Sequence, residues 1–376
     1  MLRVLHCIYD DPRNPWVGGG GSVRIYEMYR RLQGEVDVTV ATGNYPGARD
    51  ERIEGIRYIR LGLRSPYALS RLSYGLAATR LLVRADYDVA VFDFSAYTPI
   101  LVPRRQPVVI TVHHLVTPTA RERWGSLLGA AVARFERAML RRARFFTATS
   151  AYTEERLRPL LPAAVEIARV IAGVPDELFE LPREDRGYLL FFGRLDVFQK
   201  GLDTLLAAMA QLVRRQPAIE LRIAGRGKDA ERVRQLAREL GIEPNIRLLG
   251  GVSDAERLEL FAGASMLLMP SRFEGFGIVA AEAMAAGLPV IAAAAGSLPE
   301  VVRAPEGGIL VPPDDPDALA EAIASLLESP ERREALGRAA RRIAREYSWS
   351  AVAREHLRFL RHVAAQVRGT HTPSES

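Results

Sequence analysis

The sequence Glu274-Gly-Phe-Gly-Ile-Val-Ala-Ala-Glu282 carries the strongest fold signal in this 376-residue chain. The apolar run Ser265-Met-Leu-Leu-Met-Pro270 leads into it, and Gly287-Leu-Pro289 ends its alanine-rich segment before a second apolar run begins at Val290. A strand, a glycine-containing turn, a helix and a second strand in this order are typical of a parallel βαβ unit.

Two carboxylates bracket this stretch. Glu274 is expected in the turn at the carboxyl end of a strand, and Glu282 about one turn into the helix. Open α/β sheets bind ligands at that edge. A helix start presents free N–H groups and the positive end of its dipole to an anion. The two acids therefore predict a ligand that carries sugar hydroxyls and a phosphate.

Length and composition narrow the class of protein. A chain with 48% hydrophobic residues over this length can form two cores, so two domains are expected. The single cysteine, Cys7, excludes an intrachain disulfide, and no Cys/His spacing suggests a metal site. No secretory signal is recognisable, and the longest apolar run, residues 278–295, is interrupted by Glu282 and Gly287-Leu-Pro289. A cytoplasmic protein without a bound metal is expected.

The excess of basic over acidic residues is confined to the first half of the chain. Residues 1–180 contain 25 Arg and 19 acidic residues, whereas residues 181–376 contain 26 basic and 26 acidic residues. The first half is thus the one that would meet an anionic partner or a membrane surface. An amphipathic basic helix over residues 121–144 could lie on a membrane or cover the sheet. No basic run is interleaved with aromatics, so no nucleic-acid partner is expected.

Lysine is rare, because 49 of the 51 basic residues are Arg and only Lys200 and Lys228 are Lys. A position that keeps lysine in this arginine-rich background is one that requires a compact ammonium on a flexible side chain. Arg194 and Lys200 flank the first loop of the second half, between an apolar strand at residues 188–192 and a helix from Leu202. Two cations in such a loop suit a diphosphate, although solvated surface charges are the alternative.

Strands and helices alternate in both halves. Strands are predicted at residues 3–9, 36–41, 56–60, 88–92, 108–112, 145–149, 167–171, 188–192, 220–224, 246–249, 266–269, 289–293 and 308–311. Helices are predicted at residues 23–33, 67–84, 121–142, 153–160, 202–214, 229–240, 254–262, 278–286, 316–327, 331–346 and 351–367. This alternation predicts an α/β protein with parallel sheets covered on both faces, and a linker near residues 174–186.

Two features of the first half also point to a site. The run Gly18-Gly-Gly-Gly21-Ser22 follows the first strand, and it lacks both the dinucleotide fingerprint and the Walker pattern. Its glycines would let the backbone approach a ligand closely, unless the run is a surface loop. His113 follows the strand 108–112, and Asp93 follows the strand before it. His113 is a candidate for the site or a structural hydrogen-bonding residue.

Three other patterns are assigned structural roles. Asp86-Tyr-Asp88 and Asp315-Pro-Asp317 have the Asp-x-Asp form of a metal–nucleotide site. The first lies where a strand starts, which is the wrong end of a parallel sheet, and the second is predicted to cap a helix. Ser297-Leu-Pro-Glu300 predicts a capping box.

Taken together, these motifs resemble the GT4 family of retaining glycosyltransferases. The resemblance rests on Gly193-Arg194-Leu with Lys200-Gly201, on residues 270–290 around Glu274 and Glu282, and on Gly296-Ser-Leu-Pro-Glu-Val, Gly308-Ile-Leu-Val-Pro-Pro and Tyr347-Ser-Trp349. It covers most of residues 188–350. The first half is similar more loosely, through the glycine run, Thr111-Val-His113 and the stretch from Phe135 to Ser150.

The resemblance implies a GT-B fold, which consists of two Rossmann-like, doubly wound domains that face each other across a cleft. Residues 1–178 and a C-terminal helix at 350–367 would form an N-terminal, acceptor-binding domain. Residues 183–349 would form a C-terminal domain that binds a nucleotide-sugar donor, and residues 368–376 a flexible tail.

The resemblance also assigns residue roles. Arg194 and Lys200 match the diphosphate ligands. Glu282 matches the ligand of the nucleotide ribose, and Glu274 that of the donor sugar's hydroxyls. The backbone of Phe276, Gly277 and Ile278 would lie beside that sugar, His113 near its reacting carbon, and Gly20 and Gly21 on the phosphate side. The catalytic set would comprise His113, Glu274, Lys200 and Arg194.

The chemistry implied is metal-independent transfer of a hexosyl unit with retention, because side chains and helix dipoles neutralise the leaving diphosphate. No cofactor is expected; the donor would be a UDP- or GDP-sugar and the acceptor a sugar, glycan or lipid-linked molecule. The alternatives are another GT-B reaction, such as epimerisation or phosphorolysis, and a catalytically silent binding module. His113-His114 and Ala172-Gly173 depart from the family's frequent His-Asp and Asn-Gly, which leaves the acceptor side open.

Overall fold

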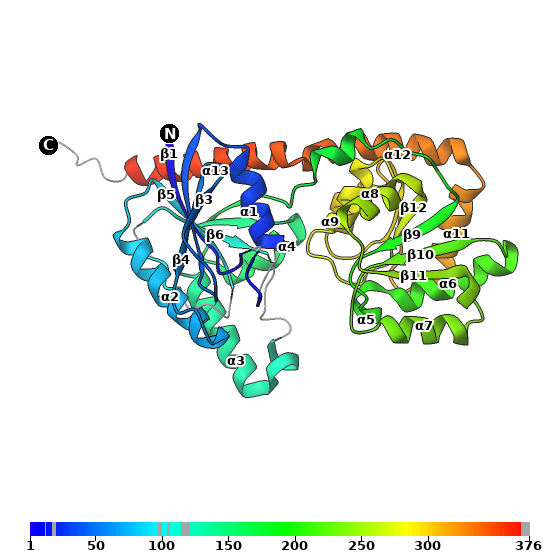
Figure 1. Ribbon diagram of the computed structural model, residues 1–376, viewed down its shortest axis with the longest axis horizontal. Coiled ribbons are helices and arrows are strands. Elements are labelled where there is room, and N and C mark those ends of the chain that lie inside the picture. The colour runs from blue at the N-terminus through cyan, green and yellow to red at the C-terminus, as the bar shows by residue number, and fades with distance from the viewer. Residues whose placement is uncertain (12, 17–19, 96–99, 104–105, 114–119, 370–376) are drawn as a thin grey trace. The chain divides into compact units, whose positions relative to one another are not determined.

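The computed structural model describes residues 1–11, 13–16, 20–95, 100–103, 106–113 and 120–369 (Figure 1). The chain forms two compact units. Unit 1 contains residues 1–172 and the segment that begins at Trp349, and unit 2 contains Gly173–Ser348. His114, Gly18 and Gly19 lie outside the described residues, as does the predicted tail from residue 370 onward.

Unit 1 is built on an eight-stranded sheet with the order β3-β4-β2-β1-β5-β6-β7-β8. Every neighbouring pair is parallel except β3 and β4. The strands are β1 (Leu2–Cys7), β2 (Val36–Gly43), β3 (Glu51–Ile53), β4 (Ile56–Leu61), β5 (Val89–Asp93), β6 (Val108–Val112), β7 (Phe145–Ala148) and β8 (Glu166–Arg169).

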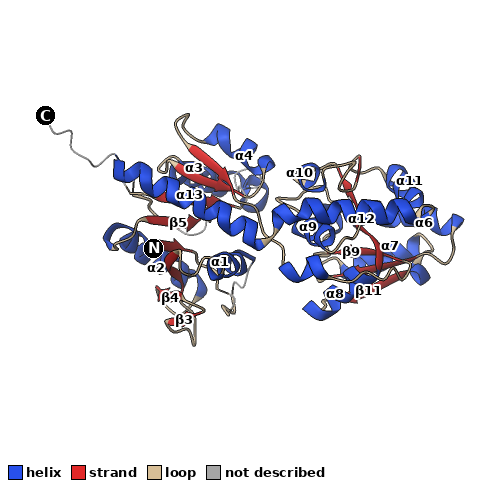
Figure 2. Cartoon of the chain, turned by 90° about the horizontal axis from the view of Figure 1, so that it is seen from above, coloured by secondary structure: helices blue, strands red, loops and turns tan. Residues whose placement is uncertain are grey.

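Alternate residues of β1 face the two sides of this sheet, as the strand period requires. Val4 and Ile8 pack in one cluster with α1 (Gly20–Arg30) and α13 (Trp349–Gly369), so the chain's last helix completes the core of unit 1 (Figure 2). Leu5 and Cys7 pack in another cluster with α2 (Tyr67–Arg84), α3 (Ala120–Leu140) and α4 (Ala151–Leu157). Met139 and Leu140 are buried there, so the end of α3 covers the sheet.

Unit 2 contains a six-stranded, fully parallel sheet with the order β11-β10-β9-β12-β13-β14. This is the 3-2-1-4-5-6 order of a doubly wound fold. The strands are β9 (Tyr188–Phe192), β10 (Glu220–Ala224), β11 (Ile246–Gly250), β12 (Ala264–Met269), β13 (Val290–Ala293) and β14 (Ile309–Val311).

Nine helical segments accompany this sheet within the described part of unit 2. They are η2 (Asp176–Glu180), α5 (Val197–Lys200), α6 (Leu202–Arg215), α7 (Ala230–Glu239), α8 (Asp254–Gly263), α9 (Ile278–Ala285), α10 (Leu298–Val302), α11 (Pro316–Leu327) and α12 (Pro330–Ala344), besides the short turns η3 (Glu243–Asn245) and η4 (Arg345–Tyr347). In unit 1, η1 (Arg158–Leu160) extends α4. The α/β class and the doubly wound sheets predicted from the sequence are confirmed.

The boundary between the units differs from the predicted one. Unit 2 begins at Gly173 rather than at residue 183, and the chain returns to unit 1 at Trp349 rather than at residue 350. Val174 donates a backbone hydrogen bond to Tyr347 at 2.8 Å, and η2 buries Leu178 and Phe179. The segment predicted as part of the first domain therefore packs in the second unit.

Within the residues that the structure covers, no helix is long and apolar enough to cross a bilayer.

Candidate functional site

Strand order places the candidate site of unit 2. From β9 the chain winds outward through β10 and β11, and it then returns to β12, which pairs with the other side of β9. The loops after β9 and β12 therefore flank the point where the strand order reverses, and that is the ligand-binding crevice of open α/β sheets. Arg194 and Lys200 follow β9, and Glu274 follows β12.

Lys200 and Glu274 form an ion pair between these two loops. The Lys200 Nζ contacts a Glu274 carboxylate oxygen, and both side chains are largely shielded from solvent. The Lys200 backbone lies in the one-turn helix α5, which Asp196 caps by accepting from the Gln199 N–H at 2.8 Å. The sequence predicted these two residues separately, and the fold brings them into contact.

Backbone packing holds the two loops together. The Arg272 N–H donates to the Gln199 carbonyl at 3.0 Å. Gly201 has φ +63°, and a Cβ there would lie 2.0 Å from the Pro270 carbonyl oxygen. A side chain at Gly201 would force the loops apart, so the glycine of the Lys200-Gly201 pair is required for the Lys200–Glu274 contact.

Arg194 is exposed beside this pair, and its Nη2 donates to the Gln199 side-chain oxygen at 3.0 Å. An exposed guanidinium hydrogen-bonded to a neutral amide retains its full charge for an anion.

The Glu274 backbone is fixed from a third loop, the one after β13. The Ser297 N–H and hydroxyl both donate to the Glu274 carbonyl at 3.3 Å. A Cβ on Gly296 would lie 2.4 Å from that carbonyl oxygen. The predicted capping box at Ser297–Glu300 is wrong, because Ser297 makes no side-chain cap and bonds Glu274 instead. The capping box of unit 2 in the described residues is formed by Ser253 and Glu256.

The helix α9 begins directly after this loop. Gly277 is its N-cap in the left-handed region at φ 82°, and no side chain caps it. The leading N–H groups near Ile278 are therefore available to an anion. Phe276 is buried and packs edge-on against Tyr347 with ring centroids 5.8 Å apart, which fixes where the helix starts.

Glu282 lies one turn into α9 and is buried. Burial raises the pKa of its carboxyl, and the Arg257 guanidinium opposes that shift, with Nη1 2.5 Å from a Glu282 oxygen. Among the described residues, Glu282 pairs with Arg257 rather than with Lys200. Arg257 was missed from the sequence, because α8 places it 25 residues away from Glu282 without a recognisable spacing.

The remaining predicted site residues lie in unit 1. Its sheet reverses order between β1 and β5, and β6 is next to β5. His113 follows β6, and its Nε2 is 2.8 Å from an oxygen of Asp93, the last residue of β5. The other Asp93 oxygen is 3.0 Å from the Nε2 of His6 in β1. His6 was not predicted as a site residue.

Gly20 and Gly21 form the first turn of α1, which begins three residues before the predicted helix start at Val23. A Cβ on Gly21 would lie 3.0 Å from the Ile8 side chain and 3.9 Å from carboxylate oxygens of Asp10 and Asp93. The helix start is therefore close to the ends of β1 and β5, and a side chain at Gly21 would require the Ile8 side chain to shift.

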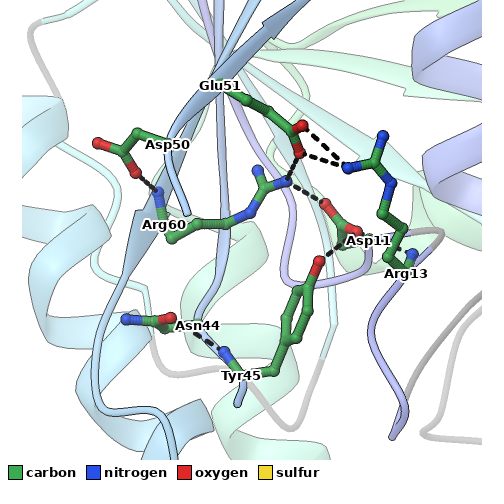
Figure 3. Close-up of polar contacts among 7 residues, drawn as sticks. All are labelled: Asp11, Arg13, Asn44, Tyr45, Asp50, Glu51 and Arg60. Carbon is green, nitrogen blue, oxygen red and sulfur yellow. Dashed lines mark hydrogen bonds and ion pairs between the residues drawn. The ribbon is translucent and has the colours of Figure 1, made fainter. Parts of the chain in front are cut away.

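A network of ion pairs holds the segment after β1, which carries Asp10 (Figure 3). Asp11 is buried, pairs with Arg60 at 2.9 Å and accepts from the Tyr45 hydroxyl at 3.0 Å. Glu51 bridges Arg60 at 3.0 Å and Arg13 at 2.9 Å. Because both charges of the Asp11–Arg60 pair are buried and compensated, this network fixes the loop rather than offering free charge to a ligand.

The Asp-x-Asp patterns have structural roles. Asp86 and Asp88 both pair with Arg3 at the start of β1. Asp315 caps α11 by accepting from the Ala318 N–H at 2.9 Å.

Comparisons with known proteins agree with this geometry. Residues 175–343 match the family model described as glycosyl transferases group 1, and residues 18–176 match the model described as glycosyltransferase family 4. The MMP alpha-(1->4)-mannosyltransferase of Mycolicibacterium hassiacum is 33% identical over 314 residues, covering 78% of this chain and 76% of that protein. The D-inositol 3-phosphate glycosyltransferase of a Nocardioides species is 38% identical over 49% of this chain, which spans 43% of that relative.

Solved structures show the same architecture. The sucrose-phosphate synthase of Thermosynechococcus elongatus superposes with a TM-score of 0.78 at 25% identity, over 97% of this chain and 100% of that chain. Anabaena HepE, solved with UDP and glucose, superposes with a TM-score of 0.72 at 18% identity, over 96% of this chain and 100% of its own. The fold is that of a GT-B glycosyltransferase. The chain belongs to glycosyltransferase family 4.

Proposed function

We propose that this glycosyltransferase moves a hexosyl unit, with retention and without a bound metal, from a nucleotide-diphosphate sugar to a sugar, glycan or lipid-linked acceptor. The observation that carries the proposal is the Lys200–Glu274 pair beside the uncapped start of α9, at the switch point of unit 2. Lys200 provides an ammonium for a diphosphate, and Glu274, in contact with it, provides a carboxylate for sugar hydroxyls.

The leaving diphosphate gains negative charge as the bond to the sugar breaks. Lys200, the exposed Arg194 and the N-terminus of α9 supply three sources of positive potential at one sheet edge. Charge stabilisation aimed at a leaving group is the largest single contribution in many enzymes. These groups take the place that a divalent cation has in metal-dependent transferases.

Binding of the rest of the donor follows from the two acids. Glu274 accepts hydrogen bonds from the donor sugar's hydroxyls and orients the ring, with the backbone of Phe276, Gly277 and Ile278 beside it. Glu282, held by Arg257, accepts from the ribose hydroxyls of the nucleotide. Glu274 is a binder here and not a nucleophile, since its carboxylate is already engaged by Lys200.

The reaction breaks the bond between the anomeric carbon and a phosphate oxygen, and forms a bond from the acceptor oxygen to the same face of that carbon. The acceptor's proton passes to the departing phosphate oxygen, so no protein base is consumed. In this proposal unit 1 binds the acceptor, with His113 beside the reacting sugar and Gly20 and Gly21 on the phosphate side.

The proposal is tested by incubating the purified chain with UDP-, GDP-, ADP- and dTDP-sugars in EDTA and measuring nucleoside diphosphate release. Slow hydrolysis of one or two of these donors is expected, with UDP- or GDP-sugars as the candidates. Mannosyl donors belong in the screen because one relative is named a mannosyltransferase. Hydrolysis that appears only after a divalent cation is added would contradict the metal-free mechanism.

A lipid-linked acceptor is favoured by the outer face of α2. Leu69, Leu72, Leu76 and Val83 are each about half exposed along one side of this helix. No acidic residue occurs from residue 55 to residue 85, whereas Arg64, Arg71, Arg80 and Arg84 are present. Exposed apolar side chains flanked by arginines, without acids, are suited to an anionic bilayer surface.

Co-sedimentation with phospholipid vesicles tests this contact. Binding to vesicles with anionic headgroups, and weaker binding to zwitterionic ones, is expected for the wild type, and the double change Leu72→Glu with Leu76→Glu should abolish it. Leu240→Glu on unit 2 is the control, since Leu240 is similarly exposed. Equal binding of all variants, or none of the wild type, would contradict a membrane contact through α2.

A further inference from the structure

Asp93 is a buried carboxylate held between two histidines. One of its oxygens is 2.8 Å from the His113 Nε2, and the other is 3.0 Å from the His6 Nε2. His6 is completely buried, whereas 28% of the His113 side chain is exposed. The carboxylate thus connects a partly exposed imidazole to one in the core.

The contacts continue from His6 into the helices. The His6 Nδ1 is 2.9 Å from the hydroxyl of Tyr29 in α1, and that hydroxyl is 3.4 Å from the Nε2 of His356 in α13. Tyr29 and His356 are both buried. In the described part of the chain, the His356 Nδ1 has no hydrogen-bond partner. The chain of contacts therefore begins at His356 and ends at His113.

Proton positions follow from the donors and acceptors available. An ionised carboxylate only accepts, so His6 and His113 must each donate from Nε2. Neutral His6 then accepts at Nδ1 from the Tyr29 hydroxyl. Tyr29 has no second proton, so its oxygen accepts from the His356 Nε2–H. Each donated proton in this series of hydrogen bonds therefore points toward Asp93. His356 then has its proton on Nε2, so its unpaired Nδ1 is an acceptor that lacks a donor.

The electrostatics of the groups agree with this assignment. Burial alone would raise the pKa of Asp93, but His113 and His6 hold it well below its ordinary value. Burial lowers the pKa of both His6 and His356, so both are neutral. The buried Arg24 guanidinium and the Asp10 carboxylate also face this cluster.

We propose that Asp93 and His6 are positioning residues that hold His113 in the Nε2–H tautomer, so that its Nδ1 accepts a hydrogen bond from a substrate hydroxyl. Nδ1 has no protein partner among the residues that the structure describes. This inference rests on the proposed function, in which His113 lies beside the reacting sugar. A carboxylate that fixes a histidine's tautomer is the logic of other catalytic constellations.

The tautomer is tested directly by NMR of the full chain labelled with ¹⁵N-histidine, with His113→Gln used to assign its signal among the six histidines. The wild type is expected to show His113 protonated at Nε2. In Asp93→Asn, the side-chain amide has one acceptor oxygen for two imidazoles, so the tautomer of His113 or His6 should change. A wild-type His113 protonated at Nδ1 would overturn the proposal, and this readout requires no substrate and no variant of Asp93.

Kinetics test whether the tautomer matters. Asp93→Asn should lower kcat roughly 10-fold to 100-fold while the donor KM changes little, because the hydrogen bond is made at the reacting sugar. His6→Gln can still donate an N–H to Asp93, and it should retain activity within about threefold of the wild type. His6→Leu removes that donor and should match Asp93→Asn. His362→Gln on the outside of α13 is the matched control and should behave as the wild type.

Equal losses of activity in His6→Gln and His6→Leu would mean that the activity depends on core packing and not on the N–H that His6 donates to Asp93. That result would overturn the role of His6. Wild-type kcat in a folded Asp93→Asn would overturn the role of Asp93. Circular dichroism melting identifies variants that do not fold. For those variants, the His113 tautomer in the wild-type NMR spectrum decides whether the proposal holds. A wild type that cleaves no donor would refute the proposed function alone.

Discussion

The two sheets reverse their strand order at equivalent places, yet they place polar residues there in different ways. In unit 2 the site residues follow the ends of β9 and β12: Lys200 in the single turn α5 pairs with Glu274 in the loop after β12, and Arg194 is exposed. In unit 1 the polar groups are in the core: His6 and Asp93 belong to strands, and Tyr29 and His356 to the helices that cover them. The first arrangement gathers charge for an anion, and the second fixes one side chain.

The comparison teaches that one fold supports two kinds of site at its switch point. Loop residues can be replaced singly without disturbing a core. A buried series of hydrogen bonds has to be complete, because each side chain satisfies a donor or an acceptor of the next. Replacing a charged side chain on the loops of unit 2 should therefore reduce activity with little loss of stability, whereas replacing a member of the buried hydrogen-bond series in unit 1 should affect activity and stability together.

The largest expected effect is that of Lys200→Ala. Loss of the ammonium at the diphosphate should lower donor turnover about 10²-fold to 10³-fold, with little change in the melting temperature. Steady-state hydrolysis and calorimetry measure the two quantities. Lys228→Ala is the matched control, because the only other lysine is 75% exposed and pairs with Asp196 at 3.6 Å. Similar losses in both variants would show that lysine charge in general, and not this contact, supports turnover.

Gly296→Ala should have the next largest effect. The new Cβ would collide with the Glu274 carbonyl, and the position has φ +58°, so the loop that orients Glu274 must move. We expect about a tenfold loss of turnover and a destabilisation of about 1–3 kcal/mol. Gly241→Ala separates the two causes, since Gly241 has φ +69° and nothing within 4 Å of the added atom. A loss of turnover in Gly241→Ala as large as in Gly296→Ala would remove the contact as the explanation.

Glu282→Gln should mainly weaken donor binding. In the proposed function Glu282 contacts the ribose in the ground state and the transition state alike, so the donor KM should rise about tenfold while kcat stays within about threefold. Glu259→Gln on the exposed side of α8 is the control. A fall in kcat with an unchanged KM would place Glu282 at the reacting carbon instead of at the nucleotide.

The smallest expected effect is a dependence of stability on pH that originates in unit 1. The pKa of His6 and His356 is lowered in the folded chain, so below pH of about 6.5 the unfolded chain binds protons that the folded chain refuses. Stability is therefore full above that pH and falls toward pH 5. Asp93 adds to the loss only at much lower pH, since its folded pKa is also lowered.

Thermal unfolding at pH 7 and pH 5 measures this effect. His356→Leu should show a smaller drop between the two pH values than the wild type, whereas His362→Gln should show the same drop as the wild type. If stability drops equally in all three proteins between pH 7 and pH 5, the acid sensitivity comes from groups other than the buried histidines.

Much of the fold could be predicted, because its signals are local. The predicted ranges of β6, β9, β10, α2 and α11 match the structure, since short apolar runs and amphipathic periods mark them. β3 and α5 are among the elements that were missed, each for a physical reason. β3, with the sequence Glu-Arg-Ile, is a polar antiparallel edge strand without an apolar signal. α5 is a single turn, shorter than any helical period, and it holds Lys200.

The candidate site was predicted unevenly for the same reason. Lys200, Glu274 and Glu282 belong to motifs a few residues long, so sequence reading found them. Their partner Arg257 is recruited by tertiary structure and has no spacing that marks it, and Ser297 was recognised but assigned to a helix cap instead of to Glu274. His6 and Asp93 are 87 residues apart, and in sequence His6 is one polar residue in an apolar strand. Only the pairing of β1 with β5 brings them together.

The position of α13 in unit 1 has a consequence for biosynthesis. Unit 2 is a single continuous segment that can close as soon as its last residues leave the ribosome, whereas the core of unit 1 lacks Trp349, Val352 and Leu357 until all of unit 2 has been synthesised. The half synthesised first is thus completed last. A chain that stops after Ser348 would therefore damage unit 1, although all of unit 2 is present.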